Sequence, residues 1–165
     1  MDILSHGLWG ATILRNRKVV WWAFLSGMAP DILGSGGAFI YLLTIGKFWG
    51  TGTWQLLPPW AKELYHFHHS LLAALIYFLL LRCISRRHGI LILPYLLHIL
   101  MDAFTHATDG GGRLLYPLHT SLGISGLNWW EHWWIMALNI AGLAVVNGFF
   151  WLRGKQSISS EHIIR

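Results

Sequence analysis

The chain has 165 residues, of which 55% are apolar and 12% are charged, and its formal net charge is +5. A soluble domain carries about 25% charged residues, so this composition argues against a soluble protein and indicates a chain surrounded by lipid. The single cysteine, Cys83, excludes disulfides within the chain and zinc sites built from cysteine. The basic residues lie in short clusters between apolar segments, so we expect no nucleic-acid partner.

The N-terminal part of the chain predicts one short and one long membrane segment. Residues 3–14 are apolar but too few to cross a bilayer, so we expect a short, partly inserted helix. Asp2 is the first charge, which argues against a cleavable signal peptide. Residues 19–46 are long enough to cross, but Pro30, Asp31 and a group of glycines interrupt them. A broken helix is expected there.

The remainder predicts two loops, three further spans and a tail. The loops are 47–63 and 107–128, the spans are 64–84, 88–106 and 129–152, and a polar tail covers 153–165. The expected fold class is therefore all-α. It is a polytopic membrane helical bundle in one domain, residues 1–165, with about four spans plus the short N-terminal helix.

Positive residues predict the orientation. They cluster at 15–18, 82–87 and 153–155, whereas the two long loops carry few. Because positive residues favour the cytoplasmic side, we expect the C-terminus in the cytoplasm and both loops outside. Tryptophans at the expected span ends agree with this threading, since Trp anchors membrane interfaces.

Ionisable side chains within a membrane are costly, so each one is a functional candidate. Counted at about 1.5 Å per residue from the nearest cytoplasmic basic residue, Asp31, His69 and Asp102 all fall at a depth of roughly 20 Å. His6 and His98 fall at roughly 14 Å, about one helical turn lower. These side chains are therefore expected to meet within the membrane, near its outer face.

One predicted span carries three polar side chains on one face. His98, Asp102 and His106 recur every fourth residue, which keeps them within about 80° around a helix. Imidazole and carboxylate ligands suit zinc and can leave a position open for an acidified water. The same side chains could instead form a buried hydrogen-bonded network or a proton relay. Spacing alone leaves these alternatives open.

Weaker candidates lie at the outer boundary. His66 would share a helix face with His69, whereas His68 points elsewhere, and an interfacial histidine is commonly just an amphipathic residue. His119 and Glu131 lie at or beyond the boundary, where they could add ligands or contact a substrate headgroup.

Five motifs stand in the order of a known family. They are Ser-His-Gly-Leu-Trp-Gly-Ala at 5–11, Ala-Pro-Asp at 29–31, His-Ser-Leu-Leu at 69–72, His-Ile-Leu-Met-Asp-Ala-Phe-Thr at 98–105 and Leu-Leu-Tyr-Pro-Leu at 114–118. In these motifs the chain resembles the YdjM-like, LexA-regulated membrane-bound metal-dependent hydrolases of the bacterial inner membrane. Many members have His-Arg-Gly where this chain has residues 65–68, and whether His66 or His68 replaces that histidine is open. A more distant similarity is to zinc-dependent phospholipase C and single-strand nucleases.

The resemblance implies a hydrolase with a divalent metal, most simply zinc, in one or more copies. The implied metal-site positions are those that the depth count selects: His6, Asp31, His69, His98 and Asp102. The expected substrate is an ester or phosphoester of a lipid-like molecule from the outer leaflet of the inner membrane. Either Asp31 or Asp102 would serve as general base.

Two rival functions use the same residues. Intramembrane His and Asp also mark pathways for protons or metal ions, so the protein could be a transporter rather than an enzyme. Bis-histidine haem ligation is weaker, because it gives the aspartates no role.

Overall fold

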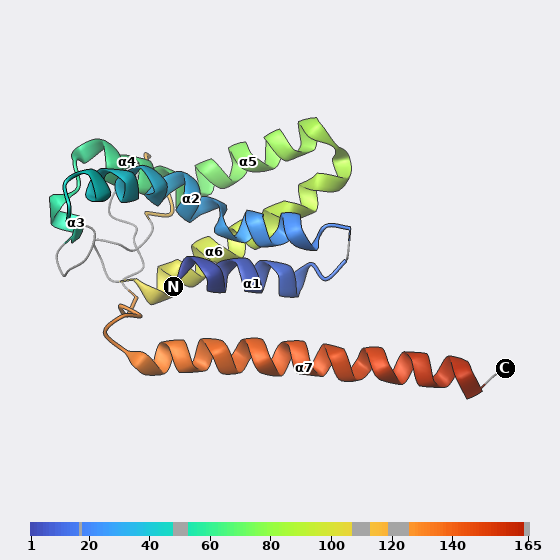
Figure 1. Ribbon diagram of the computed structural model, residues 1–165. Helices are drawn as coiled ribbons and strands as arrows, with labels where there is room; N and C mark the ends of the chain where they lie inside the picture. Colours follow the sequence, from blue (N-terminus) through green and yellow to red (C-terminus); the bar gives the residue numbers. More distant parts are fainter. Residues whose placement is uncertain (17, 48–52, 107–112, 119–125, 164–165) are drawn as a thin grey trace.

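The computed structural model describes residues 1–16, 18–47, 53–106, 113–118 and 126–163 (Figure 1). Its elements are α1 (Ile3–Ile13), α2 (Val20–Thr44), α3 (Thr53–Leu56), α4 (Pro59–His68), α5 (Leu71–Ile84), the 3₁₀ helix η1 (Arg86–Leu91), α6 (Ile92–Thr105) and α7 (Trp133–Ile163). Every element in the described ranges is a helix, which confirms the all-α prediction there. The 47–63 loop prediction is wrong in part, because α3 and the start of α4 lie within it. Pro59 favours that start, since proline suits the first helical turn.

Helix α2 is the centre of the fold and packs against α1, α4 and α6. Its backbone passes close to α1 at two small residues. A side chain on Gly27 would collide with the backbone carbonyl of His6, and one on Gly10 would collide with that of Ala23. Small residues of this kind let two helices approach closely within a membrane. The close approach carries His6 to the face of α2 that also holds Asp31.

The predicted break in the first long segment is wrong. Helix α2 continues from Val20 to Thr44 with Pro30 inside it. Proline removes one backbone hydrogen bond and commonly bends a helix without ending it. Figure 1 shows α2 changing direction near its middle.

The expected single span 64–84 is instead two helices, α4 and α5, that meet at an angle of 63°. The hydroxyl of Ser70 accepts a hydrogen bond from the Ala73 N–H at 3.2 Å and so caps the start of α5. The next free N–H, that of Leu71, donates to the Leu114 carbonyl at 2.9 Å. Both hydrogen bonds satisfy the N-terminal donors that a new helix leaves open.

Two helical stretches are long and apolar enough to cross a membrane, Arg86–Thr105 and Trp133–Arg153, and the bent pair would make a third. Helix α2 is long enough but is not among them. Its Pro30, Asp31 and glycines lower its hydropathy. Membrane association is thus supported over the described residues, whereas four spans are not confirmed.

Helix α7 lies along α1 and is otherwise exposed (Figure 1). Its backbone remains helical to Ile163, past the expected span end at 152. Asn139 holds it to α1: its side-chain oxygen accepts from the Trp9 indole at 2.7 Å and its amide donates to Ser5 at 2.7 Å. About two turns further along, Asn147 donates to Thr12 at 3.0 Å. Two asparagines therefore fix the register of α7 on α1.

Candidate metal centre

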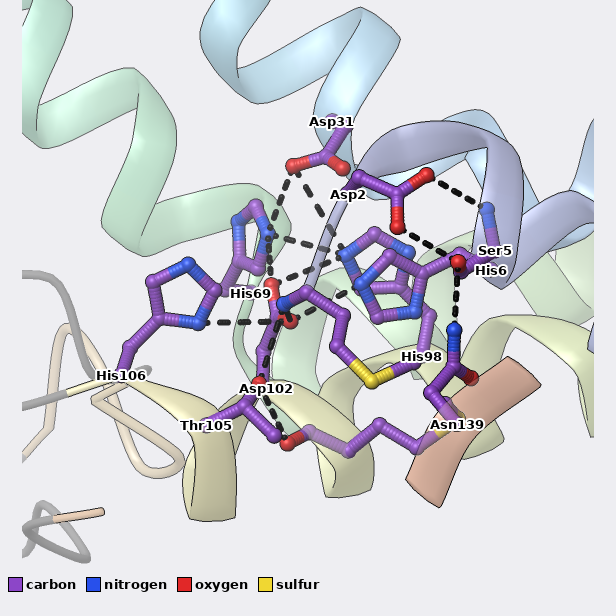
Figure 2. Close-up of polar contacts among 12 residues, drawn as sticks. Asp2, Ser5, His6, Asp31, His69, His98, Asp102, Thr105, His106 and Asn139 are labelled. Carbon is purple, nitrogen blue, oxygen red and sulfur yellow. Dashed lines mark hydrogen bonds and ion pairs between the residues drawn. The ribbon is translucent and has the colours of Figure 1, made fainter. Parts of the chain in front are cut away.

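Four polar side chains from three parts of the fold converge in one cluster (Figure 2). Asp31 comes from the middle of α2, and His69 from the junction of α4 and α5. His98 and Asp102 lie one turn apart on α6 and so share a face of that helix. We call Asp31, His69, His98 and Asp102 the central cluster. The depth prediction requires His69 and Asp102 to lie close together, and His69 Nε2 is 3.5 Å from Asp102 Oδ2.

The spacing of the ligand atoms matches that around one small cation. One ligand atom from each residue can be chosen so that all lie within 4.8 Å of one another. His69 Nε2 and His98 Nε2 are 3.2 Å apart, and Asp102 Oδ2 is 3.3 Å from His98 Nε2. Asp31 Oδ1 lies 3.5 Å from His69 Nε2 and 3.8 Å from His98 Nε2. Two ligands of one tetrahedral zinc, each about 2.0–2.1 Å from it, stand about 3.3 Å apart.

Hydrogen bonds on the far side of each ring indicate what the two Nε2 atoms carry. The Nδ1 of His69 lies 2.9 Å from the Tyr65 carbonyl, and that of His98 lies 2.7 Å from the Gly27 carbonyl. A carbonyl only accepts, so each Nδ1 carries a proton, and whenever the ring is neutral its Nε2 points a lone pair inward. Two lone pairs 3.2 Å apart repel unless a cation or a shared proton lies between them. A carbonyl behind a histidine is the usual support of a metal-binding imidazole.

Asp102 connects the central cluster to a second group of side chains. Its Oδ2 faces His69 and His98, and it has no hydrogen-bond partner of good geometry within the described residues. Its Oδ1 faces the other way, toward His6 Nε2 at 2.9 Å and His106 Nδ1 at 3.3 Å. The Met1 α-amine contacts the same oxygen at 2.6 Å. Asp102 is therefore surrounded by nitrogen atoms on both sides.

His6 is fully buried but does not belong to the central cluster. Its ring stacks on that of His98 with 3.6 Å between centroids, and its Nε2 meets Asp102 Oδ1 rather than Oδ2. The sequence analysis places His6 about one helical turn below Asp31, and the structure places His6 beside the central cluster, against Asp102, rather than within it.

Burial differs sharply within the central cluster. The side chains of His69, His98 and Asp102 are at most 1% exposed, whereas that of Asp31 is 16% exposed. Asp31 is thus the member of the cluster that reaches the surface of the protein.

Among the weaker candidates in the described residues, His106 contacts Asp102, whereas His66, His68 and Glu131 lie elsewhere. His106 is the C-cap of α6 rather than part of it, yet its Nδ1 still reaches Asp102. His66 packs among aromatic rings near Trp54, the backbone carbonyl of His68 accepts from the Tyr95 hydroxyl, and Glu131 accepts from Asn128 on an exposed surface. None of these three joins the cluster. His119 lies outside the described residues.

A segment from the second expected loop, 113–118, lies against the junction of α4 and α5. Leu114 accepts the Leu71 N–H, and the Tyr116 hydroxyl donates to Glu63 on α4. That hydrogen bond raises the pKa of Tyr116 above its usual value, because the phenol is held by a carboxylate. These contacts fix the backbone beside His69.

Sequence reasoning missed the support around the site. The carbonyls of Gly27 and Tyr65 are backbone groups, so no side-chain pattern announces them. Asn139 could have been found from the sequence, because a side-chain amide in an otherwise apolar span indicates a polar contact within the protein. It accepts a hydrogen bond from Trp9 and donates to the Ser5 hydroxyl, which in turn donates to the Asp2 carboxylate. Figure 2 shows the part of this chain from Asn139 to Asp2.

Fold and site together define an all-helical protein with helices apolar enough to cross a membrane and a buried His/Asp cluster able to hold a metal ion. Comparison with known proteins adds no neighbour: no family model, no curated protein and no solved structure matches the chain.

Proposed function

We propose that the protein is a membrane-bound, metal-dependent hydrolase of an ester or phosphoester in a lipid-like substrate. One observation carries the proposal. Two imidazoles, each held at Nδ1 by a carbonyl, direct their Nε2 atoms at a point that two carboxylates also face. A divalent cation at that point would satisfy all four side chains.

The donor set fits zinc best. It has two imidazole nitrogens and two carboxylate oxygens at spacings close to tetrahedral, and zinc takes both kinds of ligand. Asp31, His69, His98 and Asp102 would hold the ion. When bound, zinc would act as a Lewis acid toward the substrate carbonyl or phosphoryl oxygen and acidify water at the site.

The two carboxylates would have different tasks. Asp102 is 1% exposed and is contacted by histidine nitrogens at both oxygens, so it would hold and orient its neighbours. Asp31 is 16% exposed, and the oxygen that faces His69 and His98 is Oδ1, so its Oδ2 would accept a proton from attacking water and release it to solvent. This favours Asp31 over Asp102 as the general base.

A membrane lipid is the natural substrate because the helices around the cluster are apolar and exposed. The resemblance to the YdjM-like hydrolases supports the same reaction and a place in the bacterial inner membrane. The distribution of positive residues supports a site toward the outer face with the C-terminus in the cytoplasm.

The proposal is tested first by metal content. Full-length protein purified in detergent without chelators should contain tightly bound zinc by elemental analysis. Asp102→Asn and His98→Ala should lose at least 90% of that zinc, because each removes a central ligand. His88→Ala is the matched control, since His88 is a histidine in η1 remote from the cluster, and it should retain the full amount.

The second test is hydrolysis. Zinc-loaded protein in lipid vesicles should cleave chromogenic esters or phosphoesters with acyl chains, and Asp31→Asn should reduce kcat at least a hundredfold. Metal-free protein would instead mean that a shared proton lies between His69 and His98. Proton or metal-ion flux through reconstituted vesicles would then identify a transporter, which is the rival function that the 3.2 Å pair also allows.

A further inference from the structure

A cavity of about 560 Å³ lies between α1 and α7, toward the end of α1 that is opposite His6 and the central cluster. Its volume is within the range of about 300–1,000 Å³ that is typical of ligand pockets. Most of its wall is apolar and includes Leu8 and Ala11 of α1 and Leu143 and Ala144 of α7. The cavity follows the chain from Leu8 to Arg15, which is roughly 10 Å at the helical rise. One leaflet of the hydrocarbon core is roughly 15 Å thick, so the cavity has a length that suits an acyl chain.

The polar side chains that line the cavity differ in whether the protein satisfies them. Asn147 donates to the Thr12 hydroxyl at 3.0 Å and to the Leu143 carbonyl at 2.9 Å, and Thr12 donates to the Leu8 carbonyl at 2.8 Å. Arg15 is exposed, and its guanidinium lies 4.3 Å from the centre of the Phe150 ring. Within the described residues Arg15 forms no ion pair with a carboxylate. Stacking occupies the face of a guanidinium and leaves the N–H groups at its edge able to bind an anion.

The position of Arg15 indicates which anion it would meet. Arg15 belongs to the basic cluster 15–18, which is predicted to lie at the cytoplasmic side of the membrane. Anionic lipids are enriched in the cytoplasmic leaflet, and basic pockets between membrane helices on that side bind their headgroups. Arginine also binds phosphate through paired N–H groups. An apolar cavity with an arginine at its cytoplasmic end therefore matches both parts of an anionic phospholipid.

We infer that the cavity between α1 and α7 binds one anionic phospholipid, with an acyl chain between the helices and the phosphate on Arg15. Arg15 lies roughly 14 Å along the chain from His6, so this lipid is a bound partner of the fold and not the substrate of the metal centre. It would fill the space beside the hydrogen bond between Asn147 and Thr12 and hold α7 against α1. The site does not depend on the proposed function, because its lining residues and the central cluster are separate sets.

The test is lipid binding to the full-length, detergent-purified and delipidated protein, measured by native mass spectrometry. The probes are dioleoyl phosphatidylglycerol, which is anionic, and dioleoyl phosphatidylcholine, which has no net charge. The wild type should bind one phosphatidylglycerol at least tenfold more tightly than phosphatidylcholine, and Arg15→Gln should abolish that preference. Arg153→Gln is the matched control, because Arg153 stacks in the same way, 4.5 Å from the centre of the Phe149 ring, but does not line the cavity. It should bind both lipids as the wild type does.

A second pair of variants tests the acyl part of the site. Ala144→Phe adds a ring inside the cavity, whereas Val145→Phe adds the same ring at a neighbouring position that is 69% exposed and outside the cavity lining. Ala144→Phe should weaken phosphatidylglycerol binding at least tenfold although Arg15 is intact, and Val145→Phe should leave it unchanged. Inorganic phosphate should not displace the lipid, because it has no chain to fill the cavity.

Three results would overturn the inference. They are equal binding of the two lipids by the wild type, equal losses in Arg15→Gln and Arg153→Gln, and displacement of the lipid by inorganic phosphate. The first two would mean that basic residues attract lipid without a defined site, and the third would mean an anion site without an acyl chain. If Arg15→Gln does not fold, the preference of the wild type and the comparison of Ala144→Phe with Val145→Phe still decide. Zinc content of the same wild-type sample tests the proposed function separately, and protein without zinc that still selects phosphatidylglycerol would refute only that function.

Discussion

The two aspartates of the site have the same chemistry but opposite surroundings. Asp102 is 1% exposed and is contacted by four histidine nitrogens and the Met1 amine. Asp31 is 16% exposed, and the described residues give it two histidine contacts, with His69 at 3.5 Å and His98 at 3.8 Å. A buried charge with many partners is costly to remove, whereas a partly exposed charge with few partners is less so. The two residues should therefore differ in stability effects.

We predict that Asp102→Asn lowers the free energy of unfolding of the metal-free protein by about 3–5 kcal/mol, as removal of one partner from a buried ion pair does. Asp31→Asn should change it by less than about 1 kcal/mol. Unfolding in detergent micelles with increasing denaturant, in the presence of a chelator, measures both values. Equal effects of the two substitutions would contradict the assignment of Asp102 as the structural carboxylate.

At the scale of single residues, the sequence predicted which side chains lie together but not which of their atoms face one another. Counting along helices placed Asp31, His69 and Asp102 at one depth, and the structure brings their ligand atoms together. The count could not tell Oδ1 from Oδ2 of Asp102, because a side-chain rotamer is set by packing. The spacing of His98, Asp102 and His106 also predicted that His106 lies on the helix, whereas α6 ends at Thr105.

Helices α1 and α2 carry His6 and Asp31, and the two helices can approach closely because Gly27 has no side chain. A methyl group there would collide with the His6 backbone carbonyl. The Gly27 carbonyl also accepts the hydrogen bond from His98 Nδ1. Pushing the two helices apart would therefore disturb both the stability of the fold and the orientation of a ligand.

We predict that Gly27→Ala destabilises the protein by about 1–3 kcal/mol, the usual cost of overpacking, and weakens zinc binding at least tenfold. Gly36 is the matched control, because it lies on the same helix and a side chain there would meet nothing within 4 Å. Gly36→Ala should be neutral or stabilising by up to about 1 kcal/mol, since alanine is the better helix former. Denaturant unfolding and zinc competition assays measure the pair, and similar results for both would refute the close-approach argument.

Hydropathy predicted where apolar helices occur but not where one of them divides. Residues 64–84 look like one span, and the division falls at His69 and Ser70 because Ser70 caps a new helix and Leu114 accepts a freed N–H. Leu114 is distant in sequence, so a local pattern could not include it. Pro30 led to the opposite error. A break was predicted there, but α2 continues through the proline and packs against neighbouring helices.

For the whole molecule, the apolar helices and the basic residues together predict an orientation in the membrane. Arg86–Thr105 and Trp133–Arg153 meet the length and hydropathy that a span needs, and the bent α4 and α5 pair meets them together. Basic residues lie in the last turn of α5 and at the start of η1, whereas residues 113–118 lie at the other end of α5, beside Leu71. The positive-inside rule then places the end of α5 in the cytoplasm and residues 113–118 outside.

The single cysteine makes that orientation measurable. Cys83 is exposed and lies next to Arg82 at the basic end of α5. We predict that a membrane-impermeant maleimide added to intact cells leaves Cys83 unlabelled, and that inside-out vesicles allow labelling. Leu118, which is 87% exposed, provides the opposite probe. In a Cys83→Ser background, Leu118→Cys should be labelled in intact cells. Labelling in detergent shows that each thiol can react. Cys83 labelled from outside, with Leu118→Cys protected, would reverse the orientation and move the metal centre toward the inner leaflet, where a different pool of lipid would be its substrate.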